Sequence, residues 1–135
     1  MIREYRHRRR VQFYETDLAG VVHFSWYLRY MEEAEHAMWR DAGISIVSEE
    51  AEFGFPRIAA TVEYNAPLHF EDEFEIHVRL DAITRRSIRY SFTLTRETTT
   101  IATGTIAAVC VSKVPPPMHA VEIPQRIVDA LSART

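Results

Sequence analysis

The segment FYETDLAGVVHFSWYLRYMEEAEH, residues 13–36, joins an acidic loop with one glycine to a long amphipathic run. From residue 26 to residue 42, apolar side chains recur every three or four positions, which is the period of one helical face. Ser25 suits the N-cap of such a helix, and Gly43 suits its C-terminal stop. The pattern predicts one long helix whose apolar stripe comprises Tyr27, Tyr30, Met31, Ala34, Ala37, Met38 and Ala42.

Four segments after this helix have the composition and alternation of β-strands. They cover residues 58–66, 73–83, 87–95 and 100–112. Short links between the last three predict antiparallel hairpins. In the second segment the predicted apolar face comprises Phe74, Ile76, Val78, Leu80 and Ala82.

The two ends of the chain supply two further elements. Residues 9–15 have strand composition, and residues 124–133 predict a short helix with Pro124 at its start. The simplest packing lays the apolar stripe of the long helix on the apolar face of the sheet. We therefore expect an α+β fold with about five antiparallel strands and one long helix, in a single domain over residues 1–135.

Composition excludes several kinds of partner. The net charge is -3 and the sequence pI is about 6.1, so no nucleic acid or acidic membrane is expected as a partner. Residues 6–10, RHRRR, are either a basic arm or an exposed chain start that runs into a strand. No secretory signal is visible, and the longest apolar run, residues 106–111, is too short to span a bilayer. These features predict a cytoplasmic protein.

Cofactor motifs are missing from the sequence. The six histidines are scattered without HExxH or paired-ligand spacing, and no P-loop, GxGxxG or GxSxG motif occurs. Cys110 is the single cysteine and lies in an apolar run, so we expect a buried side chain and no internal disulfide. We expect neither a metal nor a separate cofactor.

The block YETDLAGVVHFSWYLRYMEEAEH, residues 14–36, resembles the hotdog-fold thioesterases of the 4-hydroxybenzoyl-CoA thioesterase-like group. A weaker similarity continues through GFPRIAATVEYNAPLHFEDEFEI, residues 54–76, and the closing strands. The resemblance implies a curved antiparallel sheet wrapped around a central helix, with two protomers joining their sheets. It also implies hydrolysis of acyl-CoA thioesters, with coenzyme A as part of the substrate.

The same resemblance assigns roles in the loop before the helix. Asp17 is expected to be the nucleophile or the general base for water, and Gly20 to allow a tight turn. Backbone N–H groups near Phe24, at the positive end of the helix, are expected to bind the oxyanion. His23 is either a catalytic or orienting group or part of the wall, because many relatives carry a histidine at the position of Phe24 instead. Without the motif, Asp17 would be read as an Asx-turn or cap aspartate.

Aromatic and basic residues are candidates for substrate binding. The aromatic candidates for the acyl pocket are Trp26, Tyr27, Phe53 and Phe55, and Tyr14 is a further candidate that also suits the edge of the core. The arginine candidates for the coenzyme A phosphates are Arg57, Arg85, Arg86 and Arg89, any of which can equally be a solvated surface charge. On the helix, Glu32 is expected to hydrogen-bond in a buried or interface position, and Glu33 to be solvated.

Three functions fit these residues. The leading one is an acyl-CoA thioesterase, for which a carboxylate and water suffice. A hotdog dehydratase or hydratase is less favoured, since HFSW, residues 23–26, lacks the Pro-Gly of the HFPG-type stretch. A non-catalytic protein that binds acyl thioesters is the third. An edge strand with unpaired backbone groups predicts a homodimer or homotetramer with sites at the subunit boundary.

Overall fold

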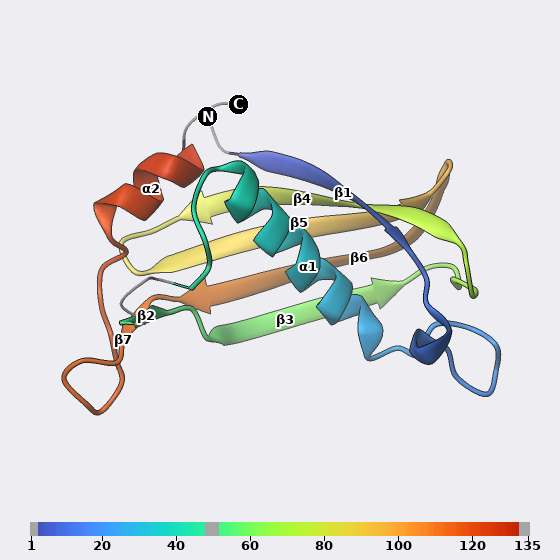
Figure 1. Ribbon diagram of the computed structural model, residues 1–135, viewed down its shortest axis with the longest axis horizontal. Coiled ribbons are helices and arrows are strands. Elements are labelled where there is room, and N and C mark those ends of the chain that lie inside the picture. Colours follow the sequence, from blue (N-terminus) through green and yellow to red (C-terminus); the bar gives the residue numbers. More distant parts are fainter. Residues whose placement is uncertain (1–2, 48–51, 133–135) are drawn as a thin grey trace.

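The computed structural model describes residues 3–47 and 52–132, and it shows a five-stranded antiparallel sheet with one long helix across a face (Figure 1). The strand order is β1-β4-β5-β6-β3, so β1 and β3 are the edges. The main elements are β1 (Glu4–Arg10), η1 (Phe13–Glu15), α1 (Trp26–Asp41), β3 (Arg57–Tyr64), β4 (Glu73–Ile83), β5 (Ser87–Arg96) and β6 (Thr99–Val109). The expected α+β architecture is confirmed.

A second, smaller sheet lies at one end of the molecule. It has the order β2-β7-β8 and is built from β2 (Phe53–Gly54), β7 (Val111–Ser112) and β8 (His119–Ala120). The strand predicted over residues 100–112 therefore breaks after Val109, where the backbone leaves the main sheet. The short helix α2 (Gln125–Ser132) follows, which confirms the helix predicted over residues 124–133 as far as Ser132; residue 133 lies outside the described part. Helix α2 buries Ile127 and Leu131.

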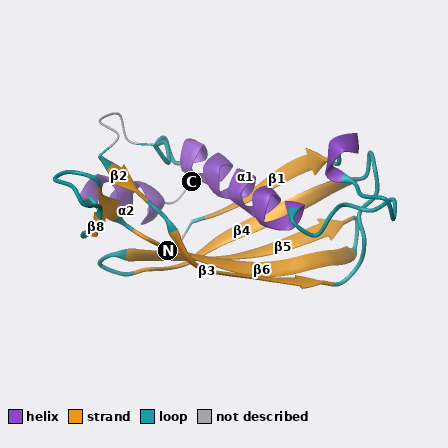
Figure 2. Cartoon of the chain, turned by 90° about the horizontal axis from the view of Figure 1, so that it is seen from below, coloured by secondary structure: helices purple, strands orange, loops and turns teal. Residues whose placement is uncertain are grey.

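Helix α1 has one face on the sheet (Figure 2). Six of the seven residues in the predicted stripe are buried, and the seventh, Ala42, is partly buried, which confirms the helical period. Gly43 has φ +84° and ends the helix as expected. Ser25 occupies the N-cap position, but its side chain makes no capping hydrogen bond. None of the described helices is long and apolar enough to cross a bilayer.

The predicted face of β4 is right up to Leu80 and wrong at Ala82. Phe74, Ile76, Val78 and Leu80 are buried. The register then slips, because Leu80 pairs with Tyr90 while Ala82 pairs with Arg89. The extra residue in this bulge is Asp81, and it shifts every later side chain to the opposite face.

The strand predicted over residues 9–15 is also wrong beyond Arg10. Val11 enters the core, and the chain turns into the 3-10 helix η1. Reciprocal hydrogen bonds form this turn: Glu15 N–H donates to the Gln12 carbonyl at 3.0 Å, and Gln12 N–H donates to the Glu15 carboxylate at 2.8 Å. The basic residues 6–10 belong to β1 rather than to a free arm, and Arg6 bonds Glu75 on β4 at 2.7 Å.

Candidate active site

A tight loop connects η1 to α1 and carries Asp17. Thr16 and Val22 form an isolated antiparallel bridge at its base. Inside it, Asp17 N–H donates to the Val21 carbonyl, and Gly20 N–H donates to the Asp17 carbonyl, both at 2.9 Å. Gly20 has φ +83°, a conformation that residues with a Cβ rarely adopt. The expected turn at Gly20 is therefore present.

The Asp17 carboxylate is partly buried in this loop. Its Oδ1 accepts the Ala19 N–H at 2.8 Å, which is the Asx-turn geometry weighed as the alternative to catalysis. Among the described residues, Oδ2 accepts no hydrogen bond. One carboxylate oxygen thus holds the loop, and the other is available for chemistry.

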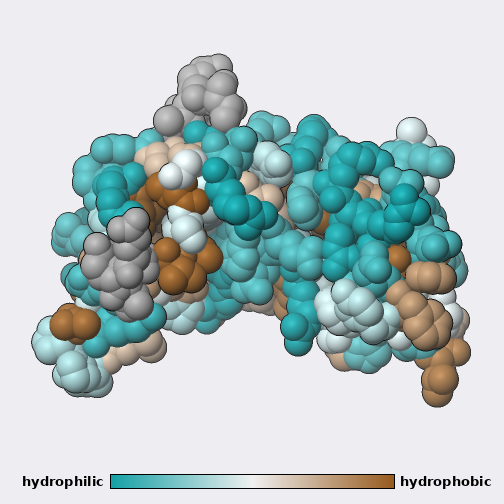
Figure 3. Space-filling model, in the orientation of Figure 1, coloured by the Kyte–Doolittle hydropathy of each residue, from teal (hydrophilic) through white to brown (hydrophobic). Residues whose placement is uncertain are grey.

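A cavity of about 480 Å³ contains Asp17 in its wall. The lining residues are Phe13, Tyr14, Thr16, Asp17, Leu18, Gly20 and Phe70. Phe13 and Leu18 are largely exposed, and hydrophobic side chains gather at the end of the molecule where this loop lies (Figure 3). Asp17 therefore stands in mostly apolar surroundings that suit an acyl group.

The chain enters α1 through His23 and Phe24. His23 N–H donates to the Glu15 carbonyl at 2.9 Å, and the His23 carbonyl accepts Trp26 N–H at 3.0 Å. Within residues 3–47 and 52–132, the Phe24 N–H donates no hydrogen bond. This N–H is therefore available at the positive end of the helix dipole.

The His23 ring faces Ser25. Its Nδ1 accepts the Ser25 N–H at 3.3 Å and lies 2.8 Å from the Ser25 hydroxyl oxygen. When the imidazole is neutral, this arrangement favours the tautomer that carries its proton on Nε2. The phenyl ring of Phe24 lies beside the imidazole, with 4.6 Å between the ring centroids.

A second cavity, of about 300 Å³, borders the same loop. Its lining comprises Val21, Val22, Phe24, Tyr27, Tyr64, Asn65, Ala66 and Pro67. Gly20 lines the first cavity and its neighbour Val21 lines the second. Because Tyr64 at the end of β3 lines the second cavity together with Tyr27, the end of β3 lies beside the start of α1.

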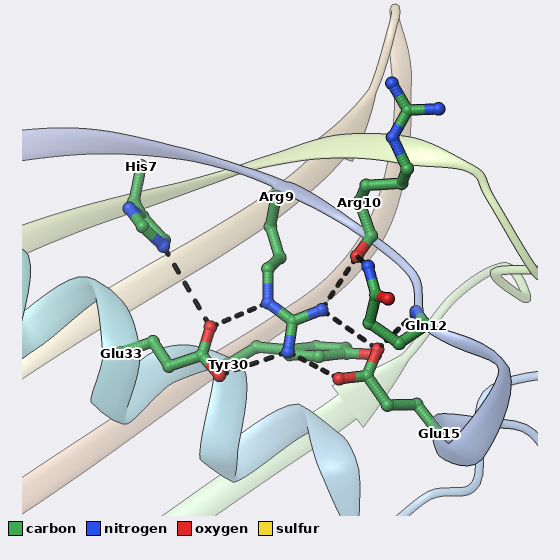
Figure 4. Close-up of polar contacts among 7 residues, drawn as sticks. All are labelled: His7, Arg9, Arg10, Gln12, Glu15, Tyr30 and Glu33. Atoms are coloured by element: carbon green, nitrogen blue, oxygen red, sulfur yellow. Dashed lines mark hydrogen bonds and ion pairs between the residues drawn. The ribbon is translucent and has the colours of Figure 1, made fainter.

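A largely buried ionic network next to the loop joins side chains of β1, η1 and α1 (Figure 4). The Glu15 carboxylate is fully buried and binds the Arg9 guanidinium through both oxygens, one contact being 2.9 Å. The Tyr30 hydroxyl and the Gln12 N–H also donate to it, each at 2.8 Å. Arg9 continues to Glu33 at 2.8 Å and lies over the Tyr30 ring. Because Glu15 is two residues before Asp17, the network fixes where the loop begins.

Burial and pairing act in opposite directions on the pKa of Glu15. Burial alone raises the pKa of a carboxyl group, but the hydrogen bonds from Arg9, the Gln12 N–H and Tyr30 lower it by more, and the net pKa is below the ordinary value. Burial and the neighbouring Glu15 charge raise the pKa of the Tyr30 hydroxyl above its usual range. Glu15 therefore carries a negative charge at neutral pH, balanced by Arg9.

A sequence profile of the thioesterase-like superfamily matches residues 11–131 of this chain. The chain belongs to the thioesterase-like superfamily. The resemblance to hotdog thioesterases is thereby confirmed, and so is the expectation of a thioester hydrolase.

Individual proteins are similar to this chain over most of its length. A crystal structure of a hypothetical protein from Aquifex aeolicus is 32% identical, with a TM-score of 0.87, and the match covers 94% of this chain and 98% of that one. A 1,4-dihydroxy-2-naphthoyl-CoA hydrolase of Synechococcus elongatus is 29% identical over 110 residues, or 79% of this chain and 81% of the relative. The structure of the gentisyl-coenzyme A thioesterase BH1999 is 27% identical, with a TM-score of 0.83, covering 94% and 99% of the two chains.

Three of the aromatic candidates of this thioesterase lie around the loop, whereas Phe53 lies on β2 and Phe55 packs against Trp39, with 5.2 Å between the ring centroids. Tyr14 is exposed in the cavity wall, and its ring packs edge-on to Trp26 at 5.6 Å. Tyr27 is buried and lines the second cavity. Asp17, Gly20, His23 and Phe24 occupy the same loop and helix start, so these seven predicted residues lie together.

The four arginine candidates lie elsewhere in the chain. Arg57 binds the buried carboxylate of Glu35 and also Glu32, at 3.2 Å. Arg85 lies in the β4–β5 turn, at the opposite end of the sheet from the Asp17 loop (Figure 1), and pairs with Glu122. Arg86 shares that turn, and Arg89 is exposed on β5. One protomer alone does not bring them to Asp17, and their role in binding phosphate stays a prediction.

The helix carboxylates differ from expectation. Glu32 accepts a hydrogen bond from Arg57 but is exposed in one protomer, so the buried alternative is wrong and the interface alternative stays a prediction. Glu33, expected to be solvated, pairs with Arg9. The residues that sequence reasoning missed are Glu15 and Glu35, both fully buried. Signals for them existed: Glu15 follows Gln12 at capping-box spacing, and Glu35 falls within the apolar stripe, four residues after Met31.

Proposed function

We propose that this thioesterase hydrolyses an acyl-CoA thioester to a carboxylate and free coenzyme A, with Asp17 and the Phe24 N–H as its reacting centre. One observation carries the proposal: a carboxylate with an available oxygen stands in an apolar cavity, on a loop that ends at an unpaired N–H of a helix start. Water and these groups suffice, so no separate cofactor is included in the proposal.

The chemistry has two forms that use the same groups. As a general base, Asp17 takes a proton from water, and the resulting hydroxide attacks the thioester carbonyl carbon. As a nucleophile, the Asp17 carboxylate attacks that carbon itself and forms an anhydride, which water then hydrolyses. In both forms the carbonyl oxygen gains negative charge and accepts a hydrogen bond from the Phe24 N–H. The C–S bond then breaks, and the coenzyme A thiolate leaves and takes up a proton.

His23 is assigned an orienting role in this scheme. Its Nδ1 is occupied by the Ser25 N–H and faces the Ser25 hydroxyl, so that edge of the ring is not available to the substrate. The imidazole instead helps fix the backbone around Phe24.

Aromatic acyl groups are the first substrates to test. Phe13, Tyr14 and Phe70 surround Asp17, and aromatic rings pack well on one another. Two relatives are named for dihydroxynaphthoyl-CoA and gentisyl-CoA, which are aromatic thioesters. Coenzyme A phosphates would bind Arg86 and Arg89 more readily than Arg57, since the charge of Arg57 is already balanced by two carboxylates.

A homodimer is part of the proposal. Strand β3 is an edge of the sheet, and it exposes apolar side chains, including Ile58 and Tyr64. A second copy that pairs along this edge would satisfy its open backbone groups and follow two-fold symmetry. Arginines from the partner subunit would then be available to the Asp17 cavity of this one. Two such dimers would give the tetramer that remains the alternative.

The test is a panel of acyl-CoA thioesters, aromatic and aliphatic, incubated with the purified protein and a thiol-reactive dye. Release of free thiol above the spontaneous rate supports the proposal. Binding without thiol release, or a change in enoyl absorbance alone, would replace it with a binding protein or a dehydratase respectively. A parallel panel of acyl carrier protein thioesters separates the two thiol carriers.

A further inference from the structure

Tyr64 makes the contact that joins strand β3 to the start of helix α1. Its hydroxyl donates to the backbone carbonyl of Phe24 at 3.0 Å. Its ring packs edge-on to that of Tyr27, with 5.0 Å between the ring centroids. Tyr64 keeps 51% of its surface exposed in one protomer.

The backbone of His23 and Phe24 is held at three of its four polar groups. The His23 N–H donates to Glu15 in η1, and the His23 carbonyl accepts from Trp26 in α1. The Phe24 carbonyl accepts from Tyr64 in β3. The group left over is the Phe24 N–H, which is the proposed oxyanion donor. Three separate elements therefore fix the peptides on both sides of it.

We propose that Tyr64 is a positioning residue that sets the direction of the Phe24 N–H for the developing oxyanion; this inference rests on the proposed function. The hydroxyl is too far along the chain to be a local cap, and it reaches Phe24 only because β3 ends beside the helix start. Without this bond, the Phe24 carbonyl would turn to solvent, and the Phe24–Ser25 peptide would keep only the contact of its N–H with His23 Nδ1 at 3.3 Å.

The effect is expected to be larger in the transition state than in the bound substrate. An oxyanion donor is most valuable when its direction is already set before charge develops on the carbonyl oxygen. An interaction that is much stronger in the transition state than in the bound substrate changes kcat more than KM. Loss of the Tyr64 hydroxyl is therefore expected to lower kcat with little change in KM.

The test compares Tyr64→Phe with Tyr5→Phe. The first change removes the hydroxyl and keeps the ring that packs on Tyr27. The second makes the same chemical change at a partly buried tyrosine on β1, the other edge of the sheet. For the panel thioester that the wild type hydrolyses fastest, Tyr64→Phe is expected to lower kcat roughly tenfold with KM within about twofold. Tyr5→Phe is expected to match the wild type.

A spectroscopic measurement checks the geometry without turnover. The carbonyl stretch of the same thioester, labelled with ¹³C at the carbonyl, is recorded by infrared difference spectroscopy when bound to Asp17→Asn. A hydrogen bond from Phe24 polarises the carbonyl and lowers its frequency. In Asp17→Asn/Tyr64→Phe the frequency is expected to move back toward that of the free thioester.

The outcomes separate this inference from the function on which it rests. An active wild type whose kcat and carbonyl frequency are unchanged by loss of the Tyr64 hydroxyl would overturn the inference and leave the function standing. The inference also fails if Tyr5→Phe lowers kcat equally, or if KM alone changes. A wild type without turnover on the whole panel would overturn the proposed function, and this inference with it.

Discussion

The guanidinium of Arg9 on β1 binds the fully buried carboxylate of Glu15, two residues before Asp17. The backbone of the same residue, Glu15, accepts the His23 N–H at 2.9 Å on the far side of the loop. One ion pair thus anchors both ends of the segment that carries the proposed catalytic groups. The stability of the loop should depend on this pair.

We expect Glu15→Gln to destabilise the protein by about 2–3 kcal/mol, because it leaves part of the largely buried Arg9 charge without a partner. The amide keeps an oxygen for the Gln12 N–H and the Tyr30 hydroxyl, so the loss should stay within that range. Urea unfolding at neutral pH measures it. Glu75→Gln, which removes the partner of the exposed Arg6, is the control and should cost far less. Equal effects from the two variants would contradict a structural role for the buried pair.

The same pair predicts a pH dependence of stability. The pKa of Glu15 is lower in the folded protein than its ordinary value of 4.5. The stabilisation that ionised Glu15 contributes is therefore fully present above pH 4.5, and it is lost as the pH falls through the lower pKa of the folded state. The free energy of unfolding should decline in that acidic range more steeply for the wild type than for Glu15→Gln. Parallel declines would show that Glu15 is not the group responsible.

A second stability prediction concerns the close approach of the helix to the sheet. A Cβ at Gly104 on β6 would lie 2.5 Å from the Thr61 backbone oxygen and 2.6 Å from the Met31 methyl carbon. The backbone oxygen cannot yield easily, so Gly104→Ala should destabilise by about 1–3 kcal/mol. At Gly54 a Cβ would meet only ordinary contacts of 3.6 Å, which makes Gly54→Ala the matched control. Thermal unfolding of both variants provides the comparison, and equal melting temperatures would contradict the tight packing.

Much of this architecture is predictable from the sequence because periodicity reports burial. The stripe on α1 and the alternation in β4 up to Leu80 identify their buried faces directly. The bulge at Asp81 is not indicated by the pattern, since apolar and polar residues keep alternating from Leu80 through Asp81 to Ala82. The turn at η1 was missed because Val11, Phe13 and Tyr14 have strand propensity, whereas hydrogen bonds between Gln12 and Glu15 decide the local conformation.

The candidate site, like the fold, can be predicted from the sequence only in part. Asp17, Gly20, His23 and Phe24 are close in sequence, so a motif can find them together. The contact between Tyr64 and Phe24 joins β3 to α1 and depends on the tertiary fold. The partners of Arg9 and Arg57 likewise come from other elements, which is why arginines that look free in the sequence are ion-paired in the structure.

Oligomerisation should follow the edge strand β3. Light scattering is expected to give at least twice the chain mass of 15.7 kDa. Ile58→Lys places a charge on the exposed edge and should shift the protein toward monomer, whereas Val47→Lys, at a similarly exposed apolar residue outside β3, should not. A monomer of the wild type that still hydrolyses thioester at nanomolar concentration would rule out a site shared between protomers.

His23→Ala should reduce activity less than Asp17→Asn does. The imidazole contacts Ser25 and orients the backbone near Phe24, but it carries out no bond-making step in the proposed scheme. We expect a loss of kcat on the order of tenfold, attributable to positioning. Steady-state kinetics of the two variants on one substrate gives the ratio. Matching losses would promote His23 to a direct participant in the reaction.

The most direct test of the proposed chemistry is the kcat of Asp17→Asn for the best panel thioester. Asparagine keeps the oxygen that accepts the Ala19 N–H, so the loop and the melting temperature should be retained. An amide can neither deprotonate water nor attack as a carboxylate, and kcat should fall on the order of 10²–10⁴-fold. A folded Asp17→Asn protein that turns over within a few-fold of the wild type would contradict the account and move the chemistry to another carboxylate.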